Sequence, residues 1–89
     1  MLKLRLTNPH NDKMIAVWLE PLCEDYWMRP GESFTIEFDE NDFSESMCGA
    51  HFDVSWVDND LVVWAGAIAH VRDQSGVELG CGHQRPPAD

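Results

Sequence analysis

Cysteine and histidine residues near the end of the chain are of the types that bind soft metal ions. Cys81-Gly82-His83 places a thiol and an imidazole two positions apart, and His70 or His51 is available as a third ligand for zinc or copper. The motif is short and has no second paired motif, so an incidental Cys and His are the simpler interpretation. We therefore expect no resident metal and no other cofactor, and keep Cys81, His83 and His70 as the candidate ligands.

Nucleophilic catalysis requires a thiol or hydroxyl beside a base and an orienting acid. Cys48, His51 and Asp53 are neighbours in sequence, and His51 and Asp53 share one face of a predicted strand. Cys48, however, falls in a predicted loop, and the chain contains no nucleophile elbow, phosphate-binding loop or HExxH motif. We predict that the protein is not an enzyme and assign no catalytic residue.

Large aromatic side chains are the strongest candidates for a binding role. The chain has four Trp in 89 residues, and Trp18 and Trp64 lie in segments that are apolar on both strand faces. An apolar outer face of a sheet is usually covered by another molecule or segment, and Tyr and Trp are enriched at interfaces. The alternatives are packing in the core, or coverage within the chain by residues 26–28 or the C-terminal tail. The candidate interaction residues are Trp18, Tyr26, Trp27 and Trp64.

The charge balance restricts the classes of partner. Sixteen Asp and Glu against six Lys and Arg give a net charge of −10. Such a chain lacks the cations that neutralise phosphates, so we expect no nucleic-acid partner and no anionic membrane partner. A basic protein is the electrostatically favoured kind of partner. The three cysteines, an odd number without a signal peptide, indicate reduced thiols and a cytoplasmic protein.

The elements that must position these residues are strands, because apolar residues recur with a period of two. Turn residues separate the apolar segments at 8–12, 29–32, 58–60 and 73–76. A loop is predicted at 39–49. About seven short strands are expected, at 2–7, 14–20, 34–39, 52–56, 61–64, 68–72 and 77–79.

This pattern predicts an all-β fold, either a small antiparallel β-sandwich or a partly closed barrel. One domain is expected at 1–80, followed by a flexible C-terminal tail at 81–89. In the segment 14–19, Ile15, Val17 and Leu19 are expected to face the core while Trp18 points the opposite way. The predicted core also contains Phe34, Ile36, Phe38, Phe52, Val54 and Trp56.

Trp18-Leu19-Glu20-Pro21, Tyr26 and the turn Pro30-Gly31-Glu32 carry a resemblance to other proteins. The chain resembles a group of short uncharacterised bacterial proteins in which a Leu-Glu-Pro strand end precedes a Pro-Gly-Glu turn. The resemblance covers residues 15–80 and implies a cupredoxin-like β-sandwich without established activity. It implies no intact copper site, because Cys81 and His83 are followed by no Met, and His51, His70 and Met47 are the upstream candidates.

Three hypotheses for function follow. The first is a non-enzymatic protein-interaction module that docks a partner, or forms a homodimer, through an aromatic sheet face. The second is an acidic inhibitor or immunity-type protein that masks a basic partner. The third is a small metal-binding protein.

Overall fold

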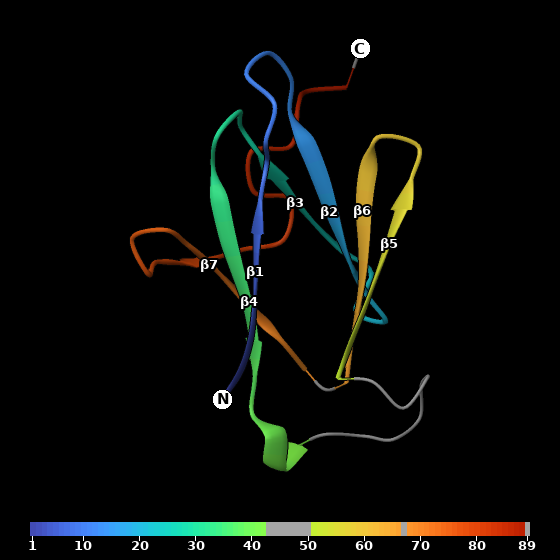
Figure 1. Ribbon diagram of the computed structural model, residues 1–89, viewed down its shortest axis with the longest axis vertical. Helices are drawn as coiled ribbons and strands as arrows, with labels where there is room; N and C mark the ends of the chain where they lie inside the picture. The colour runs from blue at the N-terminus through green and yellow to red at the C-terminus, as the bar shows by residue number, and fades with distance from the viewer. Residues whose placement is uncertain (43–50, 67, 89) are drawn as a thin grey trace.

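The chain folds into two four-stranded β-sheets that pack face to face (Figure 1). The computed structural model describes residues 1–42, 51–66 and 68–88. Sheet A has the strand order β1-β4-β7-β8, and sheet B has the order β3-β2-β6-β5. The elements are β1 (Leu2–Thr7), β2 (Ile15–Glu20), β3 (Glu24–Met28), β4 (Ser33–Phe38), the 3₁₀ turn η1 (Glu40–Asp42), β5 (Phe52–Val57), β6 (Asp60–Ala65), β7 (His70–Asp73) and β8 (Glu78–Leu79). The predicted all-β sandwich is confirmed, and the described strands form two separate sheets instead of a closed barrel.

Two details of the topology differ from the prediction. The pair β2–β6 is parallel, with Val17 opposite Leu61, so sheet B is mixed and not purely antiparallel. The two strands are far apart in the chain and are not joined by a hairpin, so local turn residues do not determine their relative direction. The additional strand is β3, where no strand was predicted and residues 26–28 were expected to form a loop.

The core lies between the two sheets and follows the predicted alternation. On β2, Ile15, Val17 and Leu19 are buried, while Trp18 points to the outer face. On β4, every second residue is also buried in the core. The buried cluster consists of Ile15, Val17, Leu19, Tyr26, Met28, Phe34, Ile36, Phe38, Leu61, Val63, Ala65, Ala69 and Val71.

The core prediction is wrong on β5. Phe52 is only partly buried and packs its ring on Phe38, with a centroid distance of 5.1 Å. Val54 is 42% exposed and Trp56 is 60% exposed. Both residues point to the inner side of sheet B, opposite Val63 and Leu61 of β6. Both side chains remain exposed because β5 is an edge strand of sheet B. The prediction failed because period-two alternation identifies the inner face of a strand, but does not show how far the opposite sheet extends over that face.

The predicted turns are present where the residues allow the required backbone. Gly31 has φ of 79° in the Arg29–Glu32 turn, and Gly76 has φ of 86° in the β7–β8 turn. Both values lie in the left-handed region that glycine adopts without a steric penalty. The Asp73 carboxylate accepts the amide hydrogens of Ser75 and Val77, which stabilises the second turn. The loop predicted at 39–49 lies mostly outside the described residues.

The first residues of the predicted tail lie along β3. The Trp27 amide donates to the His83 carbonyl at 2.9 Å, and Tyr26 and His83 form a parallel bridge. The Gln84 side chain donates to the Trp27 carbonyl at 2.7 Å. Contact with the domain therefore continues past residue 80 to at least Arg85, which forms an ion pair with Asp25.

Asn8 connects the two turns at one end of the sandwich. Its side-chain amide donates to the carbonyls of Lys13 at 2.9 Å and Met28 at 3.1 Å, and its Oδ1 accepts the His10 amide. Its backbone amide donates to the Glu32 carbonyl at 2.9 Å. The residue is fully buried, so its polar atoms depend on these partners instead of water.

We expect Asn8→Ala to lower the free energy of unfolding by about 1–3 kcal/mol, because the carbonyl of the buried Met28 and the carbonyl of Lys13 lose the Asn8 donor. Urea denaturation followed by tryptophan fluorescence measures this change. Asn11→Ala is the matched control, since Asn11 is an exposed residue of the same turn. Equal midpoints for the two variants would contradict the role given to Asn8.

Candidate interaction surface

The strand register of sheet B brings three tryptophans to its outer face. Trp18 on β2 lies opposite Val62 on β6, and Trp64 follows two residues after Val62. Trp27 on β3 lies opposite Ala16, on the same face. Cross-strand and diagonal neighbours at these spacings are within reach of aromatic side chains. We call the surface formed by Trp18, Trp27, Val62 and Trp64 the tryptophan face.

The tryptophan face is only partly exposed. Trp18 is 38% exposed, whereas Trp27, Val62 and Trp64 are half-buried. Ala16 is fully buried although it belongs to the outer face, which indicates that the neighbouring large side chains cover it. The face is therefore a packed apolar layer with an accessible centre at Trp18. Acidic residues of the same face, Glu20 and Asp53, lie on either side of Trp64.

The C-terminal residues cover the β3 end of this face. The Arg85 guanidinium forms two hydrogen bonds with Asp25, including Nε to Oδ2 at 2.7 Å. Trp27 Nε1 donates to the same Oδ2 at 2.9 Å, and the Cys81 thiol lies 3.6 Å from Oδ1. The alternative of coverage by the C-terminal tail thus applies to Asp25 and Trp27, at the β3 end of the face.

Asp25 is a buried carboxylate in this arrangement. The hydrogen bond from Arg85 is the main reason that its pKa lies well below the usual range, and the bond from Trp27 acts in the same direction. Burial opposes this shift without cancelling it. The carboxylate therefore remains charged and connects β3 to the C-terminal segment at neutral pH.

Tyr26 does not belong to the tryptophan face. It is 3% exposed and points to the inner side of sheet B, so its assignment as an interaction residue is corrected to a core position. Its hydroxyl donates to Glu24 Oε1 at 2.8 Å, and burial together with this carboxylate raises the pKa of Tyr26 above its usual value. The sequence prediction failed here because Tyr26 was placed in a loop, where no alternation defines a face.

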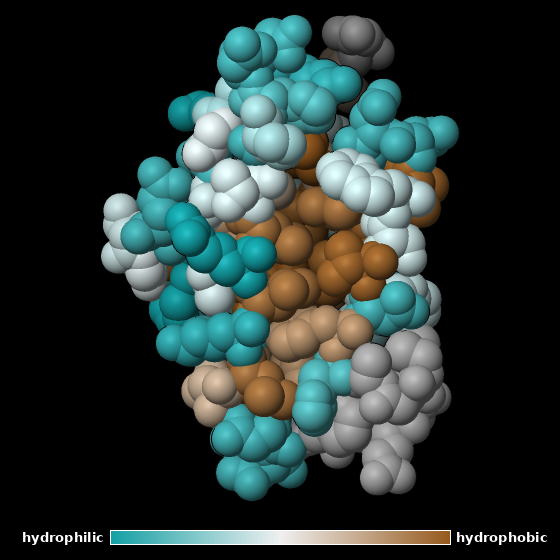
Figure 2. All heavy atoms as spheres, in the orientation of Figure 1, coloured by the Kyte–Doolittle hydropathy of each residue, from teal (hydrophilic) through white to brown (hydrophobic). Residues whose placement is uncertain are grey.

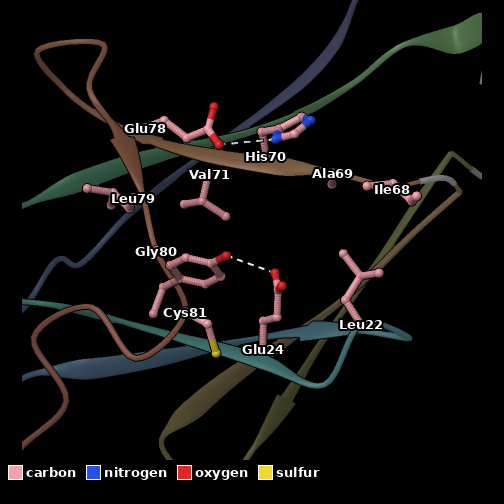
Figure 3. A pocket seen from close by; sticks show the side chains of 11 residues that line it. Leu22, Glu24, Ile68, Ala69, His70, Val71, Glu78, Leu79, Gly80 and Cys81 are labelled. Carbon is pink, nitrogen blue, oxygen red and sulfur yellow. Dashed lines mark hydrogen bonds and ion pairs between the residues drawn. The ribbon is translucent and has the colours of Figure 1, made fainter.

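A cavity of about 330 Å³ opens beside Tyr26 between β3 and the β7–β8 hairpin (Figure 3). Its walls are mainly apolar, and its polar groups include Glu24, His70, Glu78 and Cys81. His70 Nδ1 lies 3.3 Å from Glu78, so the two side chains pair when the imidazole is protonated.

The candidate metal ligands do not converge in this cavity. His70 is on the β7 side and Cys81 on the β3 side of the view in Figure 3. The His83 ring packs edge-on against Phe34, with a centroid distance of 5.7 Å. Over residues 1–42, 51–66 and 68–88, no three His, Cys, Asp or Glu side chains are grouped to hold a metal ion. Met47 lies outside the described residues.

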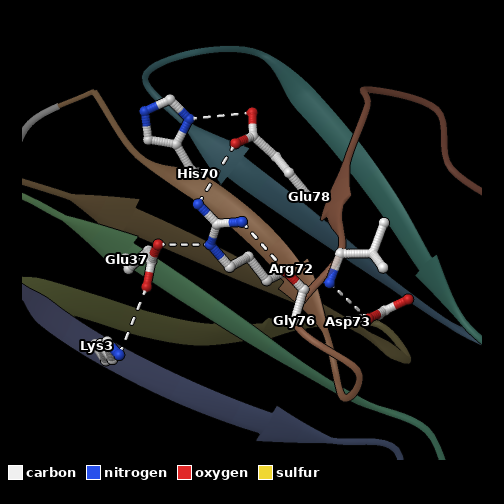
Figure 4. A network of polar contacts seen from close by, with 8 residues as sticks. Lys3, Glu37, His70, Arg72, Asp73, Gly76 and Glu78 are labelled. Carbon is white, nitrogen blue, oxygen red and sulfur yellow. Dashed lines mark hydrogen bonds and ion pairs between the residues drawn. The ribbon is translucent and has the colours of Figure 1, made fainter.

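The outer face of sheet A differs from the tryptophan face because it is polar. Arg72 Nε bonds Glu37 Oε1 at 2.7 Å, while Lys3 Nζ lies 3.9 Å from Glu37 Oε2 (Figure 4). Arg72 also reaches Glu78 at 3.7 Å and the Gly76 carbonyl at 3.2 Å. The hydrogen bond from Arg72 lowers the pKa of the buried Glu37, and the pKa of Arg72 is raised in turn. These paired charges make the outer face of sheet A polar.

Comparison with known protein families finds no match to this chain. Comparisons with curated proteins and with solved structures likewise find no significant match. The resemblance to bacterial proteins with the Leu-Glu-Pro and Pro-Gly-Glu pattern therefore stays a prediction. Among the described residues, no helix is long and apolar enough to cross a membrane.

Proposed function

We propose that this protein is a non-enzymatic protein-interaction module that binds a protein partner through the tryptophan face. The observation that carries the proposal is the position of Trp18, an exposed indole at the centre of an apolar sheet face. Trp is enriched at the centres of protein interfaces, where it buries a large area with few rotatable bonds. The neighbouring Val62 and Trp64 extend the apolar area toward β5.

The acidic residues around the face favour a basic partner, as expected of an inhibitor or immunity-type protein. Glu20 and Asp53 border Trp64, and the whole chain carries a net charge of −10. A cationic side chain also interacts favourably with an indole ring. This second candidate uses the same surface and differs in the salt dependence of partner binding.

We propose the cytoplasm as the location of the protein. Cys23 and Cys81 are free and exposed, which is the usual state of thiols in a reducing compartment.

We expect Trp18→Ala and Trp64→Ala to remain folded and to bind an apolar fluorescent dye less than half as well as the parent. Each change removes a large part of the apolar area on the tryptophan face. The dye is excited directly, so that loss of a tryptophan does not alter the signal by itself. Thermal unfolding checks that the variants are folded, and sizing chromatography reports any change of assembly.

Val77→Ala is the matched control, because Val77 is 57% exposed but lies in the β7–β8 turn, away from the tryptophan face. This control should bind dye as the parent does. If the two tryptophan variants also bind dye at the parent level and keep the parent's size, the proposed interaction surface is wrong.

A further inference from the structure

The C-terminal segment, residues 81–85, forms a tight turn against the edge of β3. The Gly82 amide donates to the Asp25 carbonyl at 2.6 Å, and the Arg85 amide donates to the Gly82 carbonyl at 2.9 Å. Gly82 has φ of 83°, a backbone conformation that favours glycine. A Cβ atom at this position would lie 3.0 Å from a nitrogen of the Arg85 guanidinium. The turn is therefore shaped to hold the Arg85 side chain against β3.

Arg85 meets the outer face of sheet B at the carboxylate of Asp25. Its Nε donates to Oδ2 at 2.7 Å, and a terminal nitrogen donates to Oδ1, so the guanidinium forms a two-bond fork. The Trp27 indole also donates to Oδ2, at 2.9 Å, which orients the carboxylate. In the register of β2 and β3, Asp25 lies directly opposite Trp18. The guanidinium site is therefore part of the outer face that carries the tryptophans.

The contacts of the C-terminal segment are polar and open to water on one side. The Arg85 side chain is 56% exposed, although the Asp25 side chain beneath it is almost fully covered. Figure 2 shows apolar side chains gathered between β1 and β5, which are the opposite edges of the two sheets. A segment held by a few water-accessible polar contacts opens locally at a lower free-energy cost than a strand of the core.

We infer that the partner of the tryptophan face places an arginine on Asp25, in the position that Arg85 occupies in the single chain. The inference rests on the proposed function and names the chemistry of the partner. That partner is a basic protein segment whose guanidinium lies beside Trp18 and Trp27. The C-terminal segment then competes with the partner for the same carboxylate.

Asp25 determines why the partner must supply an arginine. Aspartate is ionised at neutral pH, and an interface that covered it without a cation would enclose an uncompensated charge. An arginine replaces both bonds of Arg85, whereas the ammonium group of lysine does not reproduce the planar fork. Guanidinium groups also stack favourably on indole rings. The net charge of −10 attracts a basic segment over a longer range.

Binding of a peptide to the full-length Arg85→Gln variant tests the inference. The probe is a fluorescently labelled peptide of residues 80–86 with Cys81→Ser, and fluorescence anisotropy measures its affinity. The peptide should bind Arg85→Gln at least about 10-fold more tightly than it binds the parent, because the tethered Arg85 of the parent occupies the site. Arg29→Gln is the matched control, since it removes one exposed arginine elsewhere and should bind the peptide as weakly as the parent.

Two further peptides separate recognition of arginine from general attraction between charges. A peptide with lysine at the arginine position has the same charge, and it should bind Arg85→Gln at least about 10-fold more weakly. Adding Asp25→Asn to the Arg85→Gln chain should abolish the preference for arginine over lysine. Circular dichroism verifies that each variant is folded. Arg85→Lys is a second receptor that keeps the charge, and it should rank the peptides in the same order.

Equal affinity of the parent and Arg85→Gln for the arginine peptide would overturn the inference, as would equal affinity for arginine and lysine peptides. Dimers of the parent that exchange their C-terminal segments would also overturn it, and sedimentation would detect them. The proposed function is tested separately, because dye binding by Trp18→Ala does not involve Asp25. Loss of dye binding in that variant, without any preference for arginine, would support the tryptophan face and reject only the arginine site.

Discussion

Replacing Ile36 with aspartate is expected to unfold the protein at neutral pH. Ile36 is fully buried on β4, between Phe34 and Phe38 on the same strand face. The change removes about 1.5–3 kcal/mol of apolar burial. Keeping the new carboxyl protonated at pH 7 costs about 4 kcal/mol more, at 1.4 kcal/mol for each pH unit above its usual pKa.

The combined cost is close to the whole stability expected for a chain of 89 residues, which is about 4–13 kcal/mol. Circular dichroism and a thermal scan should therefore show an unfolded or strongly destabilised chain. Ile36→Val should cost only about 0.5–1.5 kcal/mol, because it removes one methyl group.

Thr35→Asp is the matched control for this prediction. Thr35 is the preceding residue on the opposite face of β4, and its strand neighbours are Arg5 and Arg72. The same carboxylate is solvated there and lies near two cations, so the variant should fold with a melting temperature close to that of the parent. An Ile36→Asp protein that melts at the same temperature as Thr35→Asp would show that β4 does not form the centre of the core.

The period-two alternation was sufficient to divide β2 and β4 into an inner and an outer face. On β4 the pattern Phe34, Ile36, Phe38 identified the buried side correctly, and on β2 it placed Trp18 on the outer face. These predictions succeed because the side-chain period of a strand is two, whatever the neighbouring strands are.

The failures on β3 and β5 have a different cause. Tyr26 was missed as a core residue because no strand was predicted at β3. Its first two residues, Glu24 and Asp25, are acidic, so the segment does not look like a strand that contributes to a core. Arg85, the ion-pair partner of Asp25, is sixty residues away in the chain. Val54 and Trp56 are exposed because sheet A does not cover β5 fully, which depends on how the two sheets are stacked and not on the residues of β5 alone.

The candidate site, like the fold, could be predicted only in part from the sequence. Trp18 and Trp64 were expected on the outer face from apolar runs, and the register places them there. Their proximity to Trp27 depends on β3, which was not predicted. The coverage of Asp25 by Arg85 depends on a segment whose composition indicated only a tail. Contacts between distant segments of this kind leave no local pattern in a single sequence.

Asp25→Asn is expected to lower the free energy of unfolding by about 2 kcal/mol at pH 7, since hydrogen bonds to a charged group are lost. The asparagine has the same shape, but it carries no charge, and the amide NH2 group that replaces one carboxylate oxygen cannot accept a hydrogen bond. It therefore cannot accept from Arg85 at both positions as the carboxylate does. Urea denaturation of parent and variant gives the difference. Asp12→Asn, an exposed position in the β1–β2 turn, should change stability little.

The same variant should also change the response to acid. The pKa of Asp25 is lowered in the folded state, mainly by the Arg85 hydrogen bond, whereas in the unfolded chain an aspartate titrates near about 3.9. Its contribution to stability is therefore complete above that unfolded value and is lost as the pH falls below it. The gap between parent and Asp25→Asn should be constant from pH 7 to 5 and shrink steadily below pH 4.

A second carboxylate provides an internal comparison for this experiment. The pKa of Glu37 is also lowered, chiefly by Arg72, so Asp25→Asn should retain part of the acid sensitivity of the parent. Arg85→Gln should remove much of the Asp25 contribution without touching that residue, because Arg85 is the main cause of its lowered pKa. If the gap between parent and Asp25→Asn stays constant down to pH 2, the Asp25 carboxylate is not the group that ties the C-terminal segment to β3.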